Sequence, residues 1–176
     1  TGFVYGLGVA DAFIRTGQAK GVLVIGTEIY SRILDWSDRG TCVLFGDGAG
    51  AVFLRAGEQV AGGPGILSTH LHSDGRFGDI LHIEGGAGST GGAGLLRMAG
   101  KEVFRHAVTK LASVVDEALG ANGLGHGDVN WLVPLQANLR IIEAMGKKLH
   151  LPPERVVVTV QKHANTSAAS IPLALA

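Results

Sequence analysis

The sequence contains a few short groups of residues whose types and spacing could support chemistry. In "THLHSD", His70 and His72 fall on the same side of an extended segment, and Asp74 follows them. Two imidazoles and a carboxylate could ligate a transition metal, although the sequence spells out no further ligand set. We favour the alternative, in which these are packed or solvated histidines at a strand end, and expect no metal site.

The glycine-rich stretch "GAGSTG", residues 86–91, matches the G-x-G-x-x-G spacing of dinucleotide-binding turns. That motif works where a strand leads directly into a helix whose N-terminus receives the pyrophosphate. Gly92 and Gly94 follow here, so no helix is expected at the required place. We interpret the stretch as a loop and keep a dinucleotide-binding domain as the weakest functional hypothesis.

Cys42 and the segment "KHANTSAAS", residues 162–170, are the other candidates. The cysteine is flanked by apolar residues, which favours a small buried side chain over a reactive thiolate. The segment is more informative, because small residues after a strand let a ligand approach the backbone. Asn165 and His163 could project donors at the carboxyl end of that strand, where open α/β sheets hold their active sites. A plain helix cap is the alternative.

Composition indicates a well-buried α/β protein. Hydrophobic residues make up 46% and charged residues 17% of the 176 positions. The 15 basic and 15 acidic residues cancel, which argues against nucleic acid or an acidic membrane surface as partner. No apolar run reaches the length of a membrane span. The single cysteine excludes an internal disulfide and suggests a reducing compartment, as in the cytoplasm.

Hydrophobic periodicity predicts strands alternating with helices. Such alternation is typical of a layered α/β fold with mostly parallel pairing, and the apolar run 21–28 indicates a strand covered on both faces. The predicted strands are 21–28, 49–55, 66–74, 129–134 and 155–160, and the predicted helices are 1–14, 100–120, 138–149 and a last one after 165–170.

A stretch rich in glycine, residues 56–65, is the best candidate boundary between two parts of the chain. We therefore expect a first part over 1–56, a linker over 57–64 and a second part over 65–176. Both ends of the sequence read as helical, which predicts that the chain is a piece of a longer polypeptide.

Four motifs together resemble one enzyme family. They are "DRGTCVLFGDGAGAVFL", "MAGKEVF", "VPLQANLRII" and "HANTSAASIPLAL". Their types and order are similar to those of β-ketoacyl-acyl-carrier-protein synthase III, a condensing enzyme that starts bacterial fatty acid synthesis. The resemblance covers essentially the whole chain. It implies an incomplete thiolase-like αβαβα fold, in which 1–56 end the N-terminal half and 65–176 form most of the C-terminal half.

The resemblance implies a decarboxylative Claisen condensation. A cysteine takes an acyl group, typically acetyl, from coenzyme A. A histidine and an asparagine then hydrogen-bond the thioester oxygen of malonyl-acyl-carrier protein as CO₂ leaves, and the carbanion attacks the acyl-enzyme. Acyl-CoA is thus a substrate and no cofactor is expected. The implied partners are acyl-CoA, malonyl-acyl-carrier protein and a second copy of the chain in a homodimer.

Matched position by position, the resemblance assigns roles to individual residues. The nucleophilic cysteine would immediately precede Thr1, and Asn165 matches the catalytic asparagine. The histidine position holds Leu135, which cannot donate a hydrogen bond, so condensation is predicted to be impaired. Phe45 matches a wall of the acyl pocket. The coenzyme A and pantetheine positions are Arg39, Gly40, Met98, Gly100, Phe104, Ala137 and Asn138, and the carrier-protein positions are Gln136, Ala137, Asn138, Leu139 and Arg140.

The helix predicted over 138–149 has a basic face, formed by Arg140, Lys147 and Lys148. Such a face suits an acidic carrier protein, and an ordinary solvated helix face is the alternative. Leu135 also leaves a second functional hypothesis open, a non-catalytic subunit of the same fold that binds acyl-CoA or pairs with an active subunit.

Overall fold

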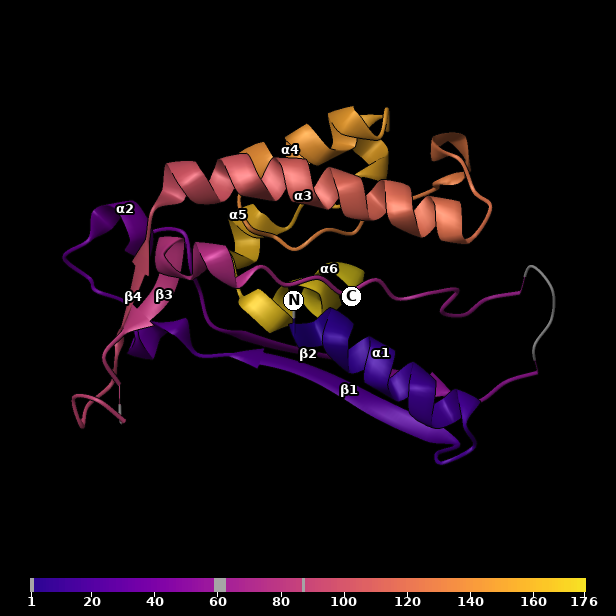
Figure 1. Cartoon of the computed structure of the whole chain (residues 1–176), viewed down its shortest axis with the longest axis horizontal. Helices are drawn as coiled ribbons and strands as arrows, with labels where there is room; N and C mark the ends of the chain where they lie inside the picture. The colour runs from indigo at the N-terminus through magenta and orange to yellow at the C-terminus, as the bar shows by residue number, and fades with distance from the viewer. Residues whose placement is uncertain (1, 59–62, 87) are drawn as a thin grey trace.

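The computed structural model describes residues 2–58, 63–86 and 88–176 (Figure 1). The centre of the predicted linker 57–64, residues 59–62, therefore lies outside the described residues. The helices are α1 (Gly2–Arg15), α2 (Arg39–Cys42), α3 (Gly100–Ala121), α4 (Leu139–Lys148), α5 (Val160–His163) and α6 (Ser170–Leu175). The strands are β1 (Gly21–Glu28), β2 (Gly48–Arg55), β3 (Leu81–Glu84) and β4 (Leu95–Met98), and short 3₁₀ turns include η1 (Tyr30–Arg32), η2 (Gly75–Ile80) and η5 (Ser167–Ala169).

An antiparallel ladder of β1 and β2 forms the lower layer of the molecule, with α1 packed on β1 and α6 on β2 (Figure 1). The two strands alternate in exposure, because successive side chains point to opposite faces. Val24 is 7% exposed, whereas Leu23 and Ile25 are 57% and 59% exposed. The expectation of cover on both faces is thus wrong for the described residues, since only one face meets α1 and α6.

Two glycines let the segment 167–172 lie directly on this ladder. A Cβ on Gly26 would overlap the Ala168 carbonyl oxygen, and a Cβ on Gly50 would be 2.9 Å from the Pro172 Cβ. Neither approach is available to a residue with a side chain. The segment that follows Asn165 can therefore approach the ladder closely because both strands have a glycine there.

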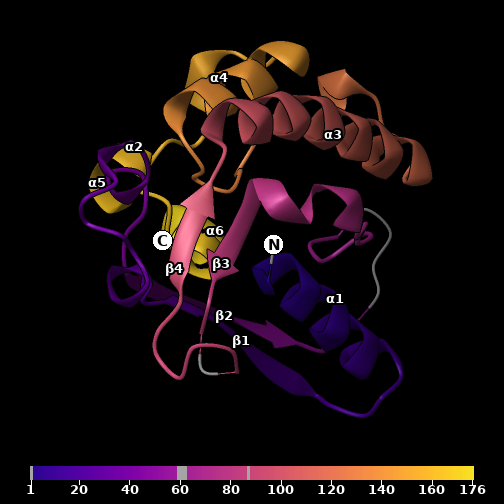
Figure 2. The same ribbon diagram turned by 60° about the vertical axis from the view of Figure 1, so that its left-hand side comes forward.

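An upper layer contains α3 and α4, and the β3–β4 hairpin spans the space between the layers (Figure 2). α4 begins where predicted, because the Asn138 side chain caps it by accepting a hydrogen bond from Ile141 N at 3.0 Å. Its buried side chains, among them Ile142 and Met145, face the interior. The predictions of helices over 1–14, 100–120 and 138–149 are confirmed to within two residues.

Strand pairing departs from the sequence-based expectation. β3 and β4 also pair antiparallel, and parallel pairing in the described residues consists of two isolated bridges, Phe45–Asn165 and Leu132–Val156. The predicted strands 129–134 and 155–160 meet only through the second bridge, and 66–74 runs without a ladder partner among the described residues. An apolar run signals burial but names neither a partner nor a direction of pairing.

Candidate active site

A cavity of about 730 Å³ lies between α3, the 132–138 segment and the turn that carries Asn165. Much of its wall is apolar, with side chains such as Val103 and Leu111 from α3. The cavity brings together seven residues that the sequence singled out. They are Phe45, Met98, Gly100, Leu135, Ala137, Asn138 and Asn165.

The backbone of Asn165 is fixed from both sides by the chain around Phe45. Asn165 N donates to Leu44 O at 2.9 Å, and Gly46 N donates to Asn165 O at 3.1 Å. The side-chain Oδ1 accepts a hydrogen bond from Ser167 N at 3.0 Å. No acceptor among the described residues bonds Nδ2, so an amide that lines the cavity keeps both of its N–H donors.

Strained backbone flanks Asn165. Ala164 has φ 57° and ψ −163°, a region that glycine alone occupies readily, and Ser167 has φ 47°. Each such residue costs roughly 1–3 kcal/mol and persists only where surrounding contacts impose it. Because the bridge to Phe45 and the contact with the β1–β2 ladder supply those contacts, the turn holds its amide in one place.

The turn that carries Leu135 is held by its neighbour Gln136, which is 1% exposed. Gln136 Nε2 donates to Pro134 O at 3.0 Å and to Val157 O at 3.1 Å. Gln136 Oε1 accepts from Thr159 N at 2.7 Å and from Val160 N at 3.0 Å. The turn is thereby locked to the 157–160 segment, and it presents the half-buried Leu135 to the cavity.

The geometry of Gln136 bears on one predicted role. The family resemblance predicts that Gln136 contacts a carrier protein, but its side chain is buried and its hydrogen-bonding groups are all occupied. Leu139 and Arg140 of the same motif are exposed at the start of α4. A glutamine in a polar motif looks like a surface contact in sequence, and only the fold reveals that its partners are backbone groups of a distant segment.

Three predicted coenzyme A residues lie outside the residues that line the cavity. Arg39 and Gly40 are exposed at the start of α2, where the Asp38 side chain caps the helix by accepting from Gly40 N at 3.1 Å. Phe104 is on α3, and the guanidinium of Arg140 on α4 lies 5.3 Å from its ring centroid. Seven of the predicted site residues thus line the cavity, whereas Arg39, Gly40 and Phe104 do not.

The wall around Phe45 is an apolar cluster with Leu34 and Leu96. The ring of Tyr30 is tilted by 52° against that of Phe45, with centroids 4.7 Å apart. Burial raises the pKa of the Tyr30 phenol, and a hydrogen bond with Ser167 opposes that shift. Cys42 packs half-buried against the same cluster, as expected for a small apolar side chain.

The N-terminal end of α1 also reaches this cavity. Val4 is among the lining residues, and a Cβ on Gly2 would be 3.6 Å from the Cβ of Ala168, three residues after Asn165. Thr1 itself lies outside the described residues. The position predicted for the nucleophile would therefore adjoin the same cavity, at a helix N-terminus, where a thiol pKa is lowered.

Sequence reasoning missed a group of side chains that also line the cavity. The rings of Phe77 and His106 lie 4.0 Å apart, and Lys110 Nζ lies 4.5 Å from the Phe77 centroid and 2.5 Å from Asp74 Oδ2. His106 and Lys110 are spaced four residues apart on α3, which places them on one face of the helix. Their pairing with the 74–77 segment has no sequence signal.

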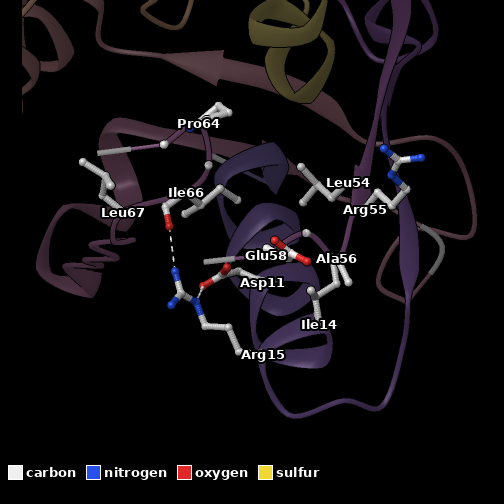
Figure 3. A pocket seen from close by; sticks show the side chains of 13 residues that line it. Asp11, Ile14, Arg15, Leu54, Arg55, Ala56, Glu58, Pro64, Ile66 and Leu67 are labelled. Carbon is white, nitrogen blue, oxygen red and sulfur yellow. Dashed lines mark hydrogen bonds and ion pairs between the residues drawn. The ribbon is translucent and has the colours of Figure 1, made fainter. Parts of the chain in front are cut away.

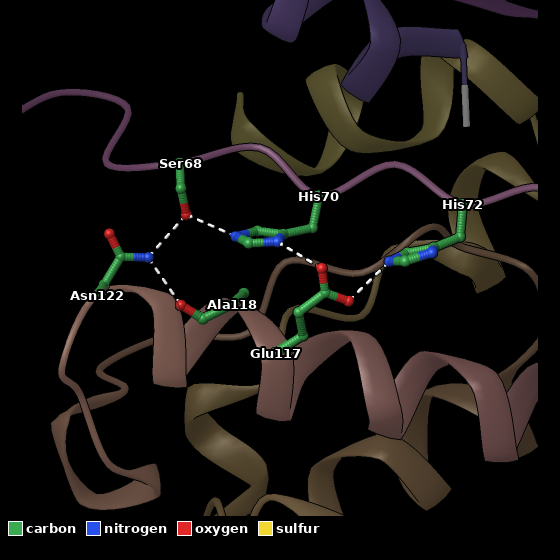
Figure 4. A network of polar contacts seen from close by, with 6 residues as sticks. All are labelled: Ser68, His70, His72, Glu117, Ala118 and Asn122. Atoms are coloured by element: carbon green, nitrogen blue, oxygen red, sulfur yellow. Dashed lines mark hydrogen bonds and ion pairs between the residues drawn. The ribbon is translucent and has the colours of Figure 1, made fainter.

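The two histidines of "THLHSD" both contact the carboxylate of Glu117 (Figure 4). His70 Nδ1 lies 2.9 Å from Glu117 Oε1 and His72 Nε2 lies 2.7 Å from Oε2, which lowers the pKa of Glu117. Asp74 is paired with Arg76 and Lys110. In the part of the chain that the structure describes, no group of three or more potential ligands is arranged to hold a metal ion.

The "GAGSTG" stretch connects β3 to β4 and is followed by a strand. Ala87 lies outside the described residues; Gly86 and Gly91 adopt positive φ values of 120° and 73°. No helix N-terminus follows to receive a pyrophosphate, so the geometry of the dinucleotide hypothesis is absent from the described residues.

A second cavity, of about 690 Å³, lies at the end of α1 beside β2 and the 63–67 segment (Figure 3). An ion pair joins Arg15 to Asp11 at 2.6 Å, and Arg15 also donates to Ile66 O at 2.7 Å. None of the residues predicted for the active site lines this cavity.

The layered α/β arrangement, with Asn165 and the start of α1 at one largely apolar cavity, agrees with the thiolase-like class of folds that the motifs imply. Comparison with known proteins identifies the family. Residues 1–75 match 3-oxoacyl-[acyl-carrier-protein] synthase III, and residues 119–176 match the C-terminal part of the same family. The chain belongs to this family.

Curated relatives agree with this assignment. The chain is 68% identical to the β-ketoacyl-[acyl-carrier-protein] synthase III of Granulibacter bethesdensis and 67% identical to that of Acidiphilium cryptum, in both cases over 99% of its length. It spans about half the length of these relatives, 55% and 54% respectively.

Solved structures confirm the fold. The 3-oxoacyl-[acyl-carrier-protein] synthase III of Aquifex aeolicus superposes with a TM-score of 0.91 at 46% identity, covering 99% of this chain and 53% of that one. The enzyme from Pseudomonas aeruginosa gives a TM-score of 0.91 at 45% identity, covering 99% and 54%. The described helices include none that is long and apolar enough to cross a membrane.

Proposed function

We propose that this chain carries part of the active site of an initiating condensing enzyme, which joins an acyl group from acyl-CoA to malonyl-acyl-carrier protein. The observation that supports this proposal most strongly is the convergence of Asn165, Leu135 and Phe45 on one cavity that the start of α1 also reaches. The two relatives reported above are both named β-ketoacyl-[acyl-carrier-protein] synthase III, which points to the same reaction.

The first half-reaction is transfer of an acyl group to a cysteine at the position before Thr1. The thiolate attacks the thioester carbonyl carbon, a new C–S bond forms, and the bond to the coenzyme A sulfur breaks, so that coenzyme A leaves as its thiolate. Phe45 and the apolar cluster behind it provide a dry wall for a short acyl chain. Neither Leu135 nor Asn165 is required for this step.

The second half-reaction is decarboxylation of the malonyl group and attack of the resulting carbanion on the acyl-enzyme. Negative charge develops on the malonyl thioester oxygen, so donors aimed at that oxygen lower the barrier. Asn165 retains such a donor because its Oδ1 is held by Ser167 N. Leu135 supplies none, and loss of one donor of this kind costs about 10²–10³ in rate.

The proposed chain therefore accepts acyl groups far better than it condenses them. Acyl-CoA is a substrate and no cofactor takes part. The exposed basic residues of α4, Arg140, Lys147 and Lys148, support docking of an acidic carrier protein. A homodimer and a cytoplasmic location complete the proposal and rest on the family resemblance.

The experiment that tests this proposal is intact-mass analysis before and after incubation with acetyl-CoA. The unmodified mass establishes whether the polypeptide includes the upstream cysteine. We expect a gain of one acetyl group in a polypeptide that does, with little turnover of malonyl-acyl-carrier protein afterwards. Absence of acylation in a cysteine-containing polypeptide would contradict the proposal.

A non-catalytic subunit of the same fold is the second candidate, and Leu135 is the observation that favours it. Such a subunit would bind acyl-CoA or pair with an active copy without being acylated. Acyl-CoA binding without a mass gain in a cysteine-containing polypeptide would support this second function over the first.

A further inference from the structure

The loop between β1 and α2, residues 29–38, leads directly into the predicted coenzyme A residues Arg39 and Gly40. At its start the loop is tied to the beginning of β2. Ser31 N and Ser31 Oγ both donate to the Asp47 carboxylate, at 2.8 Å and 2.5 Å. The direction of the rest of the loop, and thus the place of α2, must be set by other contacts.

Arg97 of β4 provides the contact near the other end of the loop. Arg97 Nη1 donates to Asp35 Oδ2 at 2.8 Å, and Arg97 Nε donates to Glu84 Oε2 at 2.8 Å. The Asp35 side chain is 23% exposed and that of Glu84 is 65% exposed, so the arm to the loop is the better shielded of the two. A shielded ion pair loses less of its energy to solvent screening.

A short series of hydrogen bonds connects Asp35 to the start of α2. The Asp35 carboxylate also accepts from Ser37 Oγ at 2.6 Å and from Ser37 N at 3.0 Å, which orders the turn. Asp38 N donates to Asp35 O at 3.0 Å, and the Asp38 carboxylate caps α2 at Gly40 N. Arg97 is therefore three hydrogen bonds away from Gly40.

β4 joins this loop to the cavity as well. Leu96 N donates to Ile33 O at 2.8 Å, and the Leu96 side chain packs with Leu34 and Phe45. Met98, the residue after Arg97, lines the cavity. β4 thus carries Met98, which lines the cavity, and next to it Arg97. The Arg97 guanidinium holds the loop that leads to Arg39 and Gly40.

We propose that Arg97 is a positioning residue for coenzyme A, acting through Asp35 to fix the 35–40 segment relative to the cavity wall. The inference rests on the proposed function, and it adds a residue outside the motifs that carry the family resemblance. Arg97 does not itself touch the substrate. Its removal leaves Arg39 and Gly40 in place in the sequence but lets the loop adopt other conformations, so that only a fraction of molecules is ready to bind.

The proposal is tested by measuring coenzyme A binding by calorimetry for Arg97→Gln, Asp35→Asn and the double variant. We expect each single variant to weaken binding about tenfold, because a charge-assisted hydrogen bond within the loop anchor is lost. The double variant should be no weaker than either single variant, because both remove the same contact. Arg97→Lys should recover part of the affinity, since an ammonium group can reach Asp35 but not form the same fork.

Two controls separate positioning from general damage. Glu84→Gln, on the exposed arm of Arg97, should change affinity less than about twofold. Arg15→Gln breaks the ion pair with Asp11, far from the loop, and removes the same charge as Arg97→Gln. It should leave binding unchanged.

A fluorescence measurement reports on the loop without any ligand. Trp36 lies between Asp35 and Ser37 and is 66% exposed, so acrylamide quenching in a Trp131→Phe background monitors this segment. Quenching should rise in Arg97→Gln and not in Arg15→Gln.

The outcomes distinguish this inference from the proposed function. If the unsubstituted protein fails to bind coenzyme A, the proposed function is contradicted and the inference falls with it. If the unsubstituted protein binds and Arg97→Gln binds equally well, or if the two single variants have additive effects, only the positioning role is overturned.

Discussion

Two turns meet at the cavity, and they differ in what they offer it. The turn around Asn165 presents an amide donor and is flanked by residues with positive φ, Ala164 and Ser167. The turn around Leu135 presents an aliphatic side chain and is held by the buried Gln136. The Asn165 turn combines strained backbone with a polar side chain at the cavity. The Leu135 turn has supporting hydrogen bonds but no polar side chain facing the cavity.

This difference shows that the support of a turn at the cavity and the chemistry of its side chain are separate properties. Gln136 bonds only backbone groups, at Pro134, Val157, Thr159 and Val160, and none of these contacts depends on the residue at 135. A side chain can therefore be exchanged at position 135 while the turn keeps its shape. With leucine at position 135 the cavity lacks a hydrogen-bond donor there, but the backbone of the turn keeps its conformation.

The largest expected effect comes from giving the Leu135 turn a hydrogen-bond donor, which the Asn165 turn already has. Leu135→His, in a polypeptide that contains the upstream cysteine, should raise condensation with malonyl-acyl-carrier protein by about 10²–10³, because a second donor reaches the developing oxyanion. Acyl-enzyme formation should hardly change. Product formation measured under saturating acetyl-CoA, beside intact mass, separates the two steps.

Asn165→Ala is the matched control for that gain. In the Leu135→His background it should remove most of the recovered rate, since the two donors act on the same oxygen and are not independent. Equal condensation by the unsubstituted protein and the Leu135→His variant would mean that the cavity does not bind the malonyl thioester as proposed.

The second prediction concerns the support of the Leu135 turn. Gln136→Leu keeps a similar volume but leaves two buried N–H groups and two carbonyl groups without their partner. It should lower the free energy of unfolding by about 3 kcal/mol, from the cost of unsatisfied buried groups. Urea denaturation measures this, with Gln161→Leu at an exposed glutamine as control. A loss no greater than that of the control would show that the hydrogen bonds of Gln136 do not hold the turn.

Much of the fold could be predicted from the sequence, because helices carry local signals. The amphipathic period of α3, and the cap at Asn138 before α4, are each contained in a few neighbouring residues. Strand pairing was not predictable in the same way. The apolar run 21–28 indicates a buried strand, but its antiparallel partner lies about 20–35 positions away, and the face that it exposes depends on where α1 and α6 pack.

The candidate site shows the same division. Asn165, Leu135, Phe45 and Met98 follow from motif resemblance, and the cavity brings them together. The burial of Gln136 and the contact of Arg97 with Asp35 could not be predicted, because each joins residues 20 or more positions apart with no periodic signal.

The third prediction tests strain in the two turns with one kind of substitution. Ala164→Gly should stabilise the protein by about 1 kcal/mol, because relief of the strained φ of 57° exceeds the added entropy of the unfolded chain. Ala137→Gly, in the turn beside Leu135, lacks a positive φ and should destabilise by roughly 0.5–1 kcal/mol. Thermal unfolding of both variants measures the contrast. The same sign for both would show that strain is not specific to the Asn165 turn.

The smallest expected effect is a dependence of protein stability on pH, and neither turn should contribute to it. Leu135, Gln136 and Asn165 do not titrate. The pKa of Glu117, in contrast, is lowered from 4.5, most of all by its hydrogen bond with His70 and next by that with His72. A carboxylate with a lowered folded-state pKa adds stability that is present above pH 4.5 and is lost as pH falls through the lower folded value. The unsubstituted protein should therefore lose stability on acidification below pH 4.5 more steeply than Glu117→Gln does.

The variants of the two turns complete this comparison. The stability of Gln136→Leu and of Ala164→Gly should change with pH as that of the unsubstituted protein does over the same range, because neither substitution adds or removes a titrating side chain. Thermal midpoints between about pH 6 and pH 3 provide the measurement. A changed slope in Gln136→Leu would mean that the Leu135 turn is coupled to a titrating group. A slope unaltered in Glu117→Gln would mean that the histidine contacts in Figure 4 add nothing to stability.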